Sequence, residues 1–435
     1  MQKRITITLA FTVFFILTAL AGNYSPQKYI ITDFGAKADG KTINTASIQE
    51  AIDKCSSTGG GIVVVPKGTF MTGAIFLKQG VNLFIEKDGV LKGTTNQAEY
   101  PQIDTRWEGI ECKWTSALVN AINLSGVEVS GDGTIDGSGT EWPRPARRTK
   151  QQWEQMPQSV RDSISKLPRI GRPRLICFQN CTNVDIANIK LLNQAVWCLH
   201  ILYCSDVKVE NLDIRAEHTI PSSDGIDIDS SNGVEITGCH IDVNDDCISI
   251  KSGKDEDGLR VNRPSESIRI ENCHFGYGHG GVAIGSETSG GIRNVDVGNC
   301  IADSGNWAPI RFKTQPSRGN VVEDITYHDI QINHVDQALE FNMEWRMVSP
   351  IAPPAKILPK IRNIKIINIS GSARSVGYIH GLKDSPIENI QFKNCNISAN
   401  TGLVVDNIKD TDFSGLKIEV KSGSPIIQKE PNQSK

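Results

Sequence analysis

The sequence carries little net charge and no block of charge of one sign. Its 435 residues include 46 Lys and Arg against 49 Asp and Glu, which leaves a formal charge of -3. A protein that binds nucleic acid needs a basic surface, so this balance argues against a nucleic-acid partner. No linker rich in Pro, Gly or Ser divides the chain either. We therefore expect a single elongated domain over residues 22–435, with a monomer as the default oligomeric state.

Long apolar runs are also missing, apart from the one at residues 5–20. Lys3 and Arg4 precede this run, and the small-x-small triplet Ala19-Leu20-Ala21 ends it. This layout is typical of a secretory signal peptide, whereas the run is short for the alternative, a membrane-spanning anchor. We expect residues 1–21 to be removed and the mature chain to be exported, either periplasmic or secreted, with no membrane attachment.

The eleven cysteines lack the spacing of a zinc site. Their number is odd, and a chain of this length does not depend on disulfides for its core. The repeat described next places four of them in one column: Cys239, Cys273, Cys300 and Cys395. We interpret these four as small apolar core residues. The others stay unassigned, and one local disulfide among them is an open alternative.

A weak internal repeat runs through the middle and the C-terminal part of the chain. Apolar anchor positions recur at intervals of 23 to 39 residues, and five residues after each anchor stands another apolar residue or Cys. The anchors are Val184, Val207, Val234, Ile268, Val295, Ile325, Ile364, Ile390 and Phe413. Four residues after most anchors stands Asn, Asp or Gly, which form tight turns. One such unit cannot bury its apolar side alone, but stacked units can.

The repeat predicts an all-β fold in which each unit forms one coil of a parallel β-helix. Stacked coils lie about 4.8 Å apart, so the turn Asn residues form a ladder and the apolar and Cys positions form an interior column. The amphipathic segment 44–55 predicts a short N-terminal helix that caps the open end of the stack. Residues 141–172 break the repeat and predict a long loop over one face.

Polar residues gather in four segments that follow one another at the spacing of the repeat. Their sequences are SDGIDI at 223–228, NDDCISIK at 244–251, GHGGVAIG at 278–285 and PIRFK at 309–313. Aligning the segments by their apolar alternation sets Ile250 above Ile284 and stacks Asp245 on His279. A second alignment, of DGIDI with DCISI, sets Asp224 against Asp246. Three carboxylates and one imidazole thus share one patch of one sheet.

This patch is a candidate catalytic site. Crowded carboxylates repel one another, so such a cluster costs free energy and marks a functional candidate. A solvated acidic strand face is the alternative, and the shared register with flanking glycines disfavours it. Glycoside hydrolysis needs a protonated carboxyl beside the leaving oxygen and a carboxylate that activates water. Arg311 and Lys313, from the next segment, can pair with a substrate carboxylate, which suggests an acidic sugar.

At these residues the sequence resembles the polygalacturonase family of glycoside hydrolases, family 28, and most closely its bacterial exo-acting members. The pattern of that family is Asn-Thr-Asp, then Asp-Asp, then Gly-His-Gly, then Arg-Ile-Lys. The corresponding motifs here are Ser222-Ser223-Asp224, Asp245-Asp246, Gly278-His279-Gly280 and Arg311-Phe312-Lys313. The resemblance covers nearly the whole mature chain. It implies a right-handed parallel β-helix, inverting hydrolysis of α-1,4-galacturonosyl linkages of pectin, and no metal or other cofactor.

The resemblance also implies a role for each residue of these motifs. The expected catalytic residues are Asp224, Asp245, Asp246 and His279. The expected substrate-binding residues are Arg311, Lys313, Ser222, Gly280 and Lys251. Asp245 would be the general acid, supported by His279, and the other two aspartates would activate the water. The expected partner is a pectic polysaccharide or an oligogalacturonide.

Two features keep alternatives open. Ser222 replaces the Asn of the family pattern, which leaves a hydrolase of rhamnogalacturonan or another substituted pectin as an alternative. Residues 251–266 resemble an insertion of exo-acting members, and a loop that closes one end of a cleft favours release of terminal galacturonic acid. A Ca²⁺-dependent pectate lyase is less favoured, because His279 and the basic pair suit hydrolysis better. A β-helical binding protein without turnover would not need the crowded carboxylates.

Overall fold

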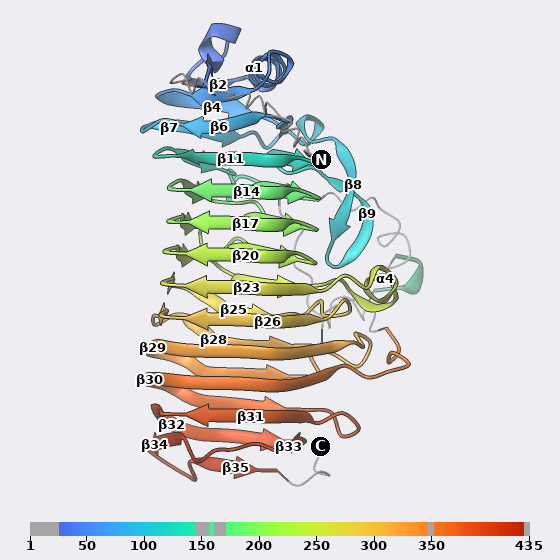
Figure 1. The fold of residues 1–435 in the computed structure, drawn as a ribbon, viewed down its shortest axis with the longest axis vertical. Helices are drawn as coiled ribbons and strands as arrows, with labels where there is room; N and C mark the ends of the chain where they lie inside the picture. The colour runs from blue at the N-terminus through green and yellow to red at the C-terminus, as the bar shows by residue number, and fades with distance from the viewer. Residues whose placement is uncertain (1–25, 144–155, 161–170, 347–351, 430–435) are drawn as a thin grey trace, which may run out of the picture.

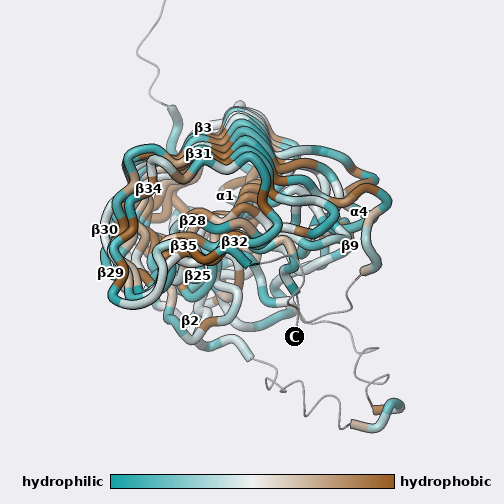
Figure 2. The backbone as a smooth tube through the Cα atoms, turned by 90° about the horizontal axis from the view of Figure 1, so that it is seen from below, coloured by the Kyte–Doolittle hydropathy of each residue, from teal (hydrophilic) through white to brown (hydrophobic). Residues whose placement is uncertain are grey.

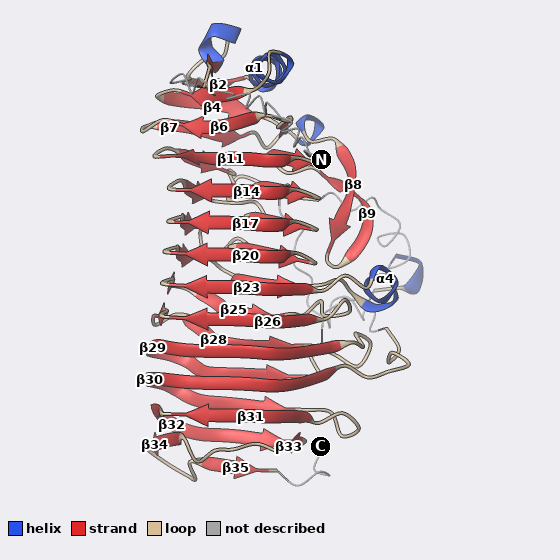
Figure 3. Cartoon of the chain, viewed as in Figure 1, coloured by secondary structure: helices blue, strands red, loops and turns tan. Residues whose placement is uncertain are grey.

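A computed structural model describes residues 26–143, 156–160, 171–346 and 352–429. In these residues the chain winds into a tall stack of coils whose strands pair in parallel with those above and below (Figure 1). Strands dominate, and the few helices lie at the N-terminal end and along one side (Figure 3). The predicted fold class, an all-β right-handed parallel β-helix, is confirmed. Within the described ranges, no helix is both long and apolar enough to span a membrane.

Pairing between coils forms three long sheets. The first holds β1 (Lys28–Ile30), β3 (Gly61–Val65), β6 (Val81–Ile85), β11 (Ser125–Gly131), β14 (Thr182–Ala187), β17 (Ser205–Glu210), β20 (Asn232–Thr237), β23 (Ser265–Glu271), β26 (Ile292–Gly298), β29 (Val321–Asn342), β30 (Lys360–His380), β31 (Ile387–Lys393) and β33 (Ile408–Lys409). The second holds β2 (Asp39–Ile43), β4 (Gly68–Thr72), β7 (Gly89–Gly93), β12 (Thr134–Asp136), β15 (Lys190–Leu192), β18 (Asp213–Arg215), β21 (His240–Asp242), β24 (His274–Phe275), β27 (Ile301–Ala302), β32 (Cys395–Asp406) and β34 (Leu416–Val420).

The third sheet carries the candidate site. It holds β5 (Ile75–Phe76), β10 (Val119–Ile122), β13 (Ile176–Gln179), β16 (Leu199–Leu202), β19 (Ile226–Asp229), β22 (Asp246–Lys251), β25 (Gly278–Ile284), β28 (Asn306–Lys313) and β35 (Ile426–Gln428). The long strands β29, β30 and β32 each run through more than one sheet. Viewed along the stack, positions of like hydropathy fall above one another from coil to coil (Figure 2).

The predicted register holds from Val184 to Ile390, because each anchor pairs with the next one along the chain. The predicted cysteine column is buried as expected. The turn ladder is also present: Asn394 Nδ2 donates to Asn368 Oδ1 at 2.8 Å, and both residues adopt left-handed backbone angles. All eleven cysteines are free thiols in the structure, so it contains no local disulfide.

The last coil departs from the predicted register. Cys395 pairs with Leu416, not with Ile418, so the prediction for this coil is wrong by two residues. The anchor at Phe413 is shifted in the same way, since its ring stacks on Phe392. The reason is that this coil is two residues shorter than the anchors predict: Ile387 pairs with Ile408, 21 residues further on, so Thr411 rather than Phe413 lies opposite Ile390.

Helix α1 (Thr45–Ser57) lies across the N-terminal end of the stack (Figures 1 and 2). Its side chains Ile48, Ala51, Ile52 and Cys55 are fully buried and follow the spacing of one helical face. The predicted capping helix is therefore confirmed, ending two residues later than expected. Two short 3-10 turns, η1 (Ile31–Phe34) and η2 (Gln97–Glu99), belong to the same end of the chain.

One hairpin lies outside the stack. Its strands β8 (Gln102–Trp107) and β9 (Ile110–Thr115) pair antiparallel and run down the side of the coils toward α4 (Asp255–Val261) (Figure 1). Lys254 N donates to Gly109 O at 2.9 Å, which ties the hairpin tip to the start of α4. Residues 251–266, expected to close one end of a cleft, contain α4 and so form part of this side wall.

Candidate active site

The candidate site lies on the outer side of the third sheet, where β19, β22 and β25 follow one another. Ile250 pairs with Ile284, as predicted. Gly225 N donates to Asp246 O at 3.0 Å, which places Asp224 beside Asp246 in the neighbouring coil. Inward-pointing isoleucines alternate with these polar residues and are fully buried in the core. The core therefore holds the polar side chains of neighbouring coils in register.

Asp245 and His279 face each other across one step between coils. His279 N donates to Asp245 O at 3.0 Å, and His279 Nδ1 lies 3.3 Å from Asp245 Oδ1. The His279 side chain is 51% exposed and that of Asp245 is 26% exposed, so this pair faces the solvent, whereas Asp224 and Asp246 are buried. The hydrogen bond to Asp245 raises the pKa of His279. The pair is placed to exchange a proton with a bound molecule.

Asp246 forms the floor of the site and is 1% exposed. Lys313 Nζ contacts its Oδ2, and Arg311 Nη1 lies 3.3 Å from its Oδ1. Burial alone would raise the pKa of Asp246, but the attraction of Lys313 and Arg311 outweighs it and lowers the pKa. Asp246 therefore stays ionised, as a carboxylate that activates water must.

Asp224 has the opposite electrostatic environment. It is 4% exposed, and burial, followed by repulsion from Asp227 and Asp245, raises its pKa well above the ordinary value. One carboxylate oxygen from each of Asp224, Asp245 and Asp246 can be chosen so that all three lie within 4.8 Å of one another. The prediction that the two inner aspartates act together on water stays a prediction. The structure distinguishes them, since Lys313 and Arg311 lower the pKa of Asp246, whereas the pKa of Asp224 stays raised although Lys251 lies 3.7 Å away.

The same three oxygens are close enough to bind one divalent cation. However, Lys251, Arg311 and Lys313 already lie against the inner carboxylates and supply positive charge. The prediction that the reaction needs no metal stays a prediction, and a chelator tests it.

Lys251 was expected among the substrate-binding residues, and the structure places its ammonium group beneath the site. Its Nζ lies 3.7 Å from Asp224, 3.4 Å from Asp227 and 3.3 Å from Glu287. The ring of Trp197 covers it, with a centroid 4.8 Å away. Burial alone would lower the pKa of Lys251, but attraction to Glu287 and Asp227 raises it. In this position Lys251 neutralises buried carboxylates, and a direct substrate contact stays a prediction.

Sequence reasoning missed two carboxylates of this buried cluster, Asp227 and Glu287. Asp227 is fully buried, and burial raises its pKa to about 7 although Lys251 lowers it. The alternation of the segment 223–228 could have revealed Asp227, because a residue between two inward isoleucines must point outward. Nothing in the sequence around Glu287 predicted that it folds back over Lys251.

Gly280 is a position where a side chain would not fit. A Cβ there would lie 2.9 Å from Asp246 Oδ1 and 3.3 Å from Arg311 Cδ. The glycine therefore allows the Asp246–Arg311 contact, and because Gly280 itself is buried, its contact with substrate stays a prediction. Ser222 is half-buried at a left-handed turn. Its neighbour Ser223 bonds Ile220 O and Asn244 N, so Ser223 stabilises the turn and Ser222 stays a predicted substrate contact.

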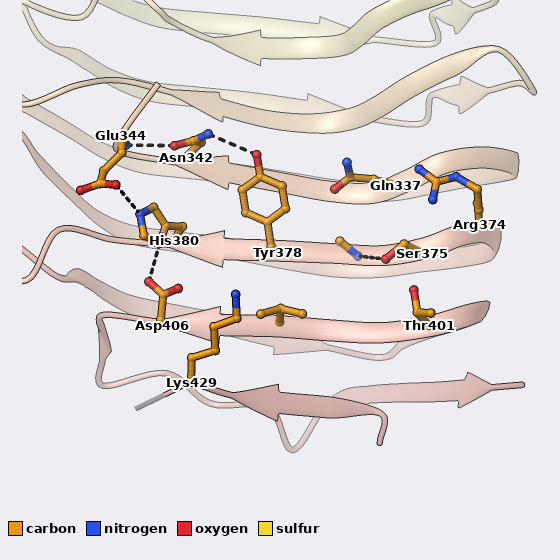
Figure 4. Close-up of a pocket in the computed structure, with 12 residues that line it drawn as sticks. Gln337, Asn342, Glu344, Arg374, Ser375, Tyr378, His380, Thr401, Asp406 and Lys429 are labelled. Atoms are coloured by element: carbon orange, nitrogen blue, oxygen red, sulfur yellow. Dashed lines mark hydrogen bonds and ion pairs between the residues drawn. The ribbon is translucent and has the colours of Figure 1, made fainter. Parts of the chain in front are cut away.

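Arg311 links the site to the coils on its C-terminal side. Its Nε lies 3.1 Å from Glu340 Oε2, and Tyr378 OH donates to Glu340 Oε1 at 2.7 Å. Tyr378 lines a cavity of about 560 Å³ on the outer side of β29, β30 and β32 (Figure 4). Other lining residues are Gln337, Asn342, Glu344, Arg374, Ser375, His380, Thr401, Asp406 and Lys429. On this side the outer surface of the sheet is hollow and polar.

On the N-terminal side the outer surface is covered. Arg106, from the hairpin, donates from Nη1 to Asp229 Oδ1 and Ser230 Oγ, both at 2.8 Å, and its side chain is fully buried. The ring of Trp107 packs against Trp197, with centroids 4.6 Å apart. Sequence reasoning missed Arg106, because its partner lies 123 residues further along the chain.

One outward-facing column shows the contrast between the two sides. Its members, in coil order, are Asn120, Cys177, His200, Asp227, Ser249, Ala283, Arg311, Glu340, Tyr378, Val404 and Ile427. The members up to Glu340 are buried, Tyr378 and Val404 are half-buried, and Ile427 is exposed. Along this column the outer surface is therefore covered as far as the coil of Glu340 and becomes exposed only in the last coils.

Comparison with known proteins agrees with these features. The family profile described as "Glycosyl hydrolases family 28" matches residues 55–415. A "Probable polygalacturonase" of Vitis vinifera is 30% identical over 383 residues, which cover 84% of this chain and 73% of the relative. An "Exo-poly-alpha-D-galacturonosidase" of Dickeya chrysanthemi is 27% identical over 442 residues, covering 92% of this chain and 72% of the relative.

Solved structures show the same fold. The exopolygalacturonase of Thermotoga maritima has a TM-score of 0.77 and 30% identity, covering 90% of this chain and 94% of that one. The family 28 exopolygalacturonase of Yersinia enterocolitica has a TM-score of 0.79 at 22% identity, covering 93% and 77%, a likeness of fold alone. With a family match over most of the chain, this protein belongs to glycosyl hydrolase family 28 and is a glycoside hydrolase of the polygalacturonase type.

Proposed function

We propose that this protein removes terminal galacturonic acid from pectic chains by hydrolysing α-1,4-galacturonosyl linkages. Asp245 gives its proton to the glycosidic oxygen as the bond between that oxygen and the anomeric carbon breaks. Asp246 accepts a proton from the water whose oxygen bonds to the anomeric carbon, and Asp224 helps to hold that water. The charges fit these roles, because Asp246 is kept ionised by Lys313 and Arg311.

The observation that supports attack at a chain end is the change in burial along the groove. Val196 and Ser223 lie in the coils on the N-terminal side of Asp245 and are 2% and 0% exposed. On the other side His279 is exposed and Trp307 is 37% exposed. This contrast favours a polymer chain that extends toward the C-terminal coils and has its other end at the covered surface. Similarity to exo-acting relatives supports the same conclusion.

Preference for an acidic sugar follows from Arg311 and Lys313. Each already contacts a carboxylate of the protein and lies at the floor of the groove, where its remaining N–H groups can meet a substrate carboxylate. Two cations beside the reacting bond favour a uronic acid over a neutral sugar. Ser222, where the family pattern has Asn, motivates a test of rhamnogalacturonan beside simple galacturonan.

Inversion of the anomeric centre rests on the family resemblance. The carboxylate oxygens lie within 4.8 Å of one another, closer than the roughly 6.5–9.5 Å between carboxyl groups typical of inverting pairs. The structure instead offers a pair of aspartates to hold the water. Proton NMR of the first product, recorded before mutarotation, tests this point. A β anomer released from the α linkage supports inversion, and an α anomer excludes it.

The test of the function is a time course of products from polygalacturonic acid and from rhamnogalacturonan, with a chelator present. Galacturonic acid as the sole product from the start supports exo-hydrolysis. A ladder of saturated oligomers would keep hydrolysis and refute the attack at chain ends. Unsaturated products, or activity lost with the chelator and restored by Ca²⁺, would favour a lyase. Activity on rhamnogalacturonan alone would change the substrate.

We further propose that the mature chain is exported and acts as a monomer. The expected signal peptide, residues 1–21, lies outside the described residues. N-terminal sequencing of the processed protein from cell fractions, together with light scattering in solution, tests both points.

A further inference from the structure

Trp307 occupies the position next to the catalytic pair on its C-terminal side and is exposed. Asp246 pairs with Gly280, and Gly280 pairs with Ala308, so the residues before them also stack. Asp245, His279 and Trp307 thus form one column over successive coils. Trp307 lies two coils, or about 10 Å, beyond Asp245. A chain that leaves the site toward the C-terminal coils must pass over this indole.

The indole is held in place by its polar edge. Trp307 Nε1 donates to Glu340 Oε2 at 3.0 Å, and Glu340 is 3% exposed and also bonded to Arg311 and Tyr378. The Arg374 guanidinium lies 5.8 Å from the ring centroid. The side chain is therefore anchored at one edge to the network of the active site, while 37% of its surface stays exposed.

Exposure of this size is unusual for an aromatic side chain in this protein. Among the described residues, the exposed large hydrophobic side chains include two aromatics, Tyr277 and Trp307. Tyr277 is stacked on His218, with ring centroids 3.9 Å apart. No ring of the described residues stacks on Trp307. The part of its aromatic surface that Arg374 does not cover is thus available to a ligand.

Beyond Trp307, on the C-terminal side, lies the cavity described above. Arg374, which faces the indole, also lines that cavity together with Gln337 and Ser375 (Figure 4). Arg374 is held by Asp336, with Nε 2.8 Å from Oδ1. Asp245, His279, Trp307 and the cavity therefore lie in sequence along one side of the stack.

We propose that Trp307 is a stacking platform for the sugar ring that lies second beyond the cleaved bond, and that it makes the enzyme prefer chains of three or more sugars. The proposal rests on the proposed function and concerns the same groove. The ligand is a galactopyranuronate ring, because the C–H groups at carbons 3, 4 and 5 of a galacto-configured ring lie on one face and suit an aromatic surface. A disaccharide places one sugar on each side of the bond and does not reach Trp307.

The test compares kcat/KM for digalacturonate and trigalacturonate in three variants. Trp307→Ala is expected to lower the trimer-to-dimer ratio by about three- to tenfold, the range of an aromatic contact. Trp307→Phe keeps a ring but loses the bond to Glu340, and should retain most of the ratio. Ile301→Ala, 40% exposed on β27 of the second sheet, is the matched control and should leave the ratio unchanged.

The ratio separates stacking from a merely structural role. If Trp307 only supported Glu340 and Arg311, dimer and trimer would lose activity together and the ratio would stay at the parental value, which overturns the proposal. If the parent cleaves no galacturonide, the proposed function fails instead. The same variants are then titrated calorimetrically with rhamnogalacturonan oligosaccharides, where equal affinity of parent and Trp307→Ala overturns the platform as well.

Discussion

The buried ion pair between Arg106 and Asp229 should hold the hairpin β8–β9 over the closed end of the groove. Both side chains are 0% exposed, and Asp229 has His200 as its other close partner, with Nε2 3.6 Å from Oδ2. Burial lowers the pKa of His200 to about 4, so this imidazole is neutral at pH 7 and cannot replace the lost charge. Removing one partner of a buried pair costs about 3–5 kcal/mol. Arg106→Met should therefore destabilise the closed hairpin by that amount.

Hydrogen exchange over residues 102–115 measures this loss locally, since a solenoid opens in parts rather than as a whole. A cost of about 3–5 kcal/mol corresponds to exchange faster by about 10²-fold to 4 × 10³-fold, at 1.4 kcal/mol for each factor of ten. The double variant Arg106→Met/Asp229→Asn should recover part of the protection, because no charge is left buried alone. The fluorescence of Trp107, which packs at the same place, gives a second readout.

The matched control is Arg260→Met, which removes an ion pair between the same hairpin and α4. Arg260 Nη2 lies 2.5 Å from Glu111 Oε2, but the two side chains are 59% and 40% exposed. Water screens a surface pair of this kind and it contributes little, so exchange should rise by less than about fivefold. Equal and small effects of Arg106→Met and Arg260→Met would refute the reasoning, and so would a double variant as unstable as the sum of its single changes.

Three further predictions follow from the site and the core. Asp245→Asn should lower turnover of galacturonan by at least about 10²-fold in a reducing-sugar assay, with unchanged circular dichroism, because this residue is outside the core; near-parental rates would exclude it as the acid. Cys273→Asp should abolish folding, judged by soluble yield and thermal melting, since it buries a charge between two other cysteines, whereas Cys112→Asp at a half-buried position should be tolerated. Burial would raise the pKa of Asp229, but attraction to Arg106 outweighs it and lowers the pKa in the folded state. The ion pair therefore stabilises the hairpin fully at pH values above 3.8, the ordinary pKa of Asp, and this stabilisation is lost as the pH falls below that value. Protection of the hairpin should thus decline below about pH 4 in the parent and change less in the double variant.

The sequence alone was sufficient for the parts of the fold that repeat. Stacked coils place equivalent residues above one another, so the anchors and the column with Cys273 could be aligned without coordinates, and Asp245 fell beside His279 as a consequence. The same logic failed in the last coil, where Leu416 takes the place expected for Ile418. There the coil is two residues shorter than predicted, and polar Thr411 lies opposite the anchor Ile390, so a search for apolar anchors selected Phe413 instead.

Only the tertiary structure decided which side of the site is covered and which carboxylates each cation contacts. The hairpin that covers the closed end is not part of the repeat, and Arg106 reaches Asp229 across 123 residues. Lys251 looked like a substrate contact, but Trp197 and Glu287 bury its ammonium group beneath the site. Contacts between stacked coils leave a periodic pattern in the sequence, because equivalent positions in neighbouring coils pack against each other. The wall and the buried charges depend on single long-range contacts, for which the sequence carries no period.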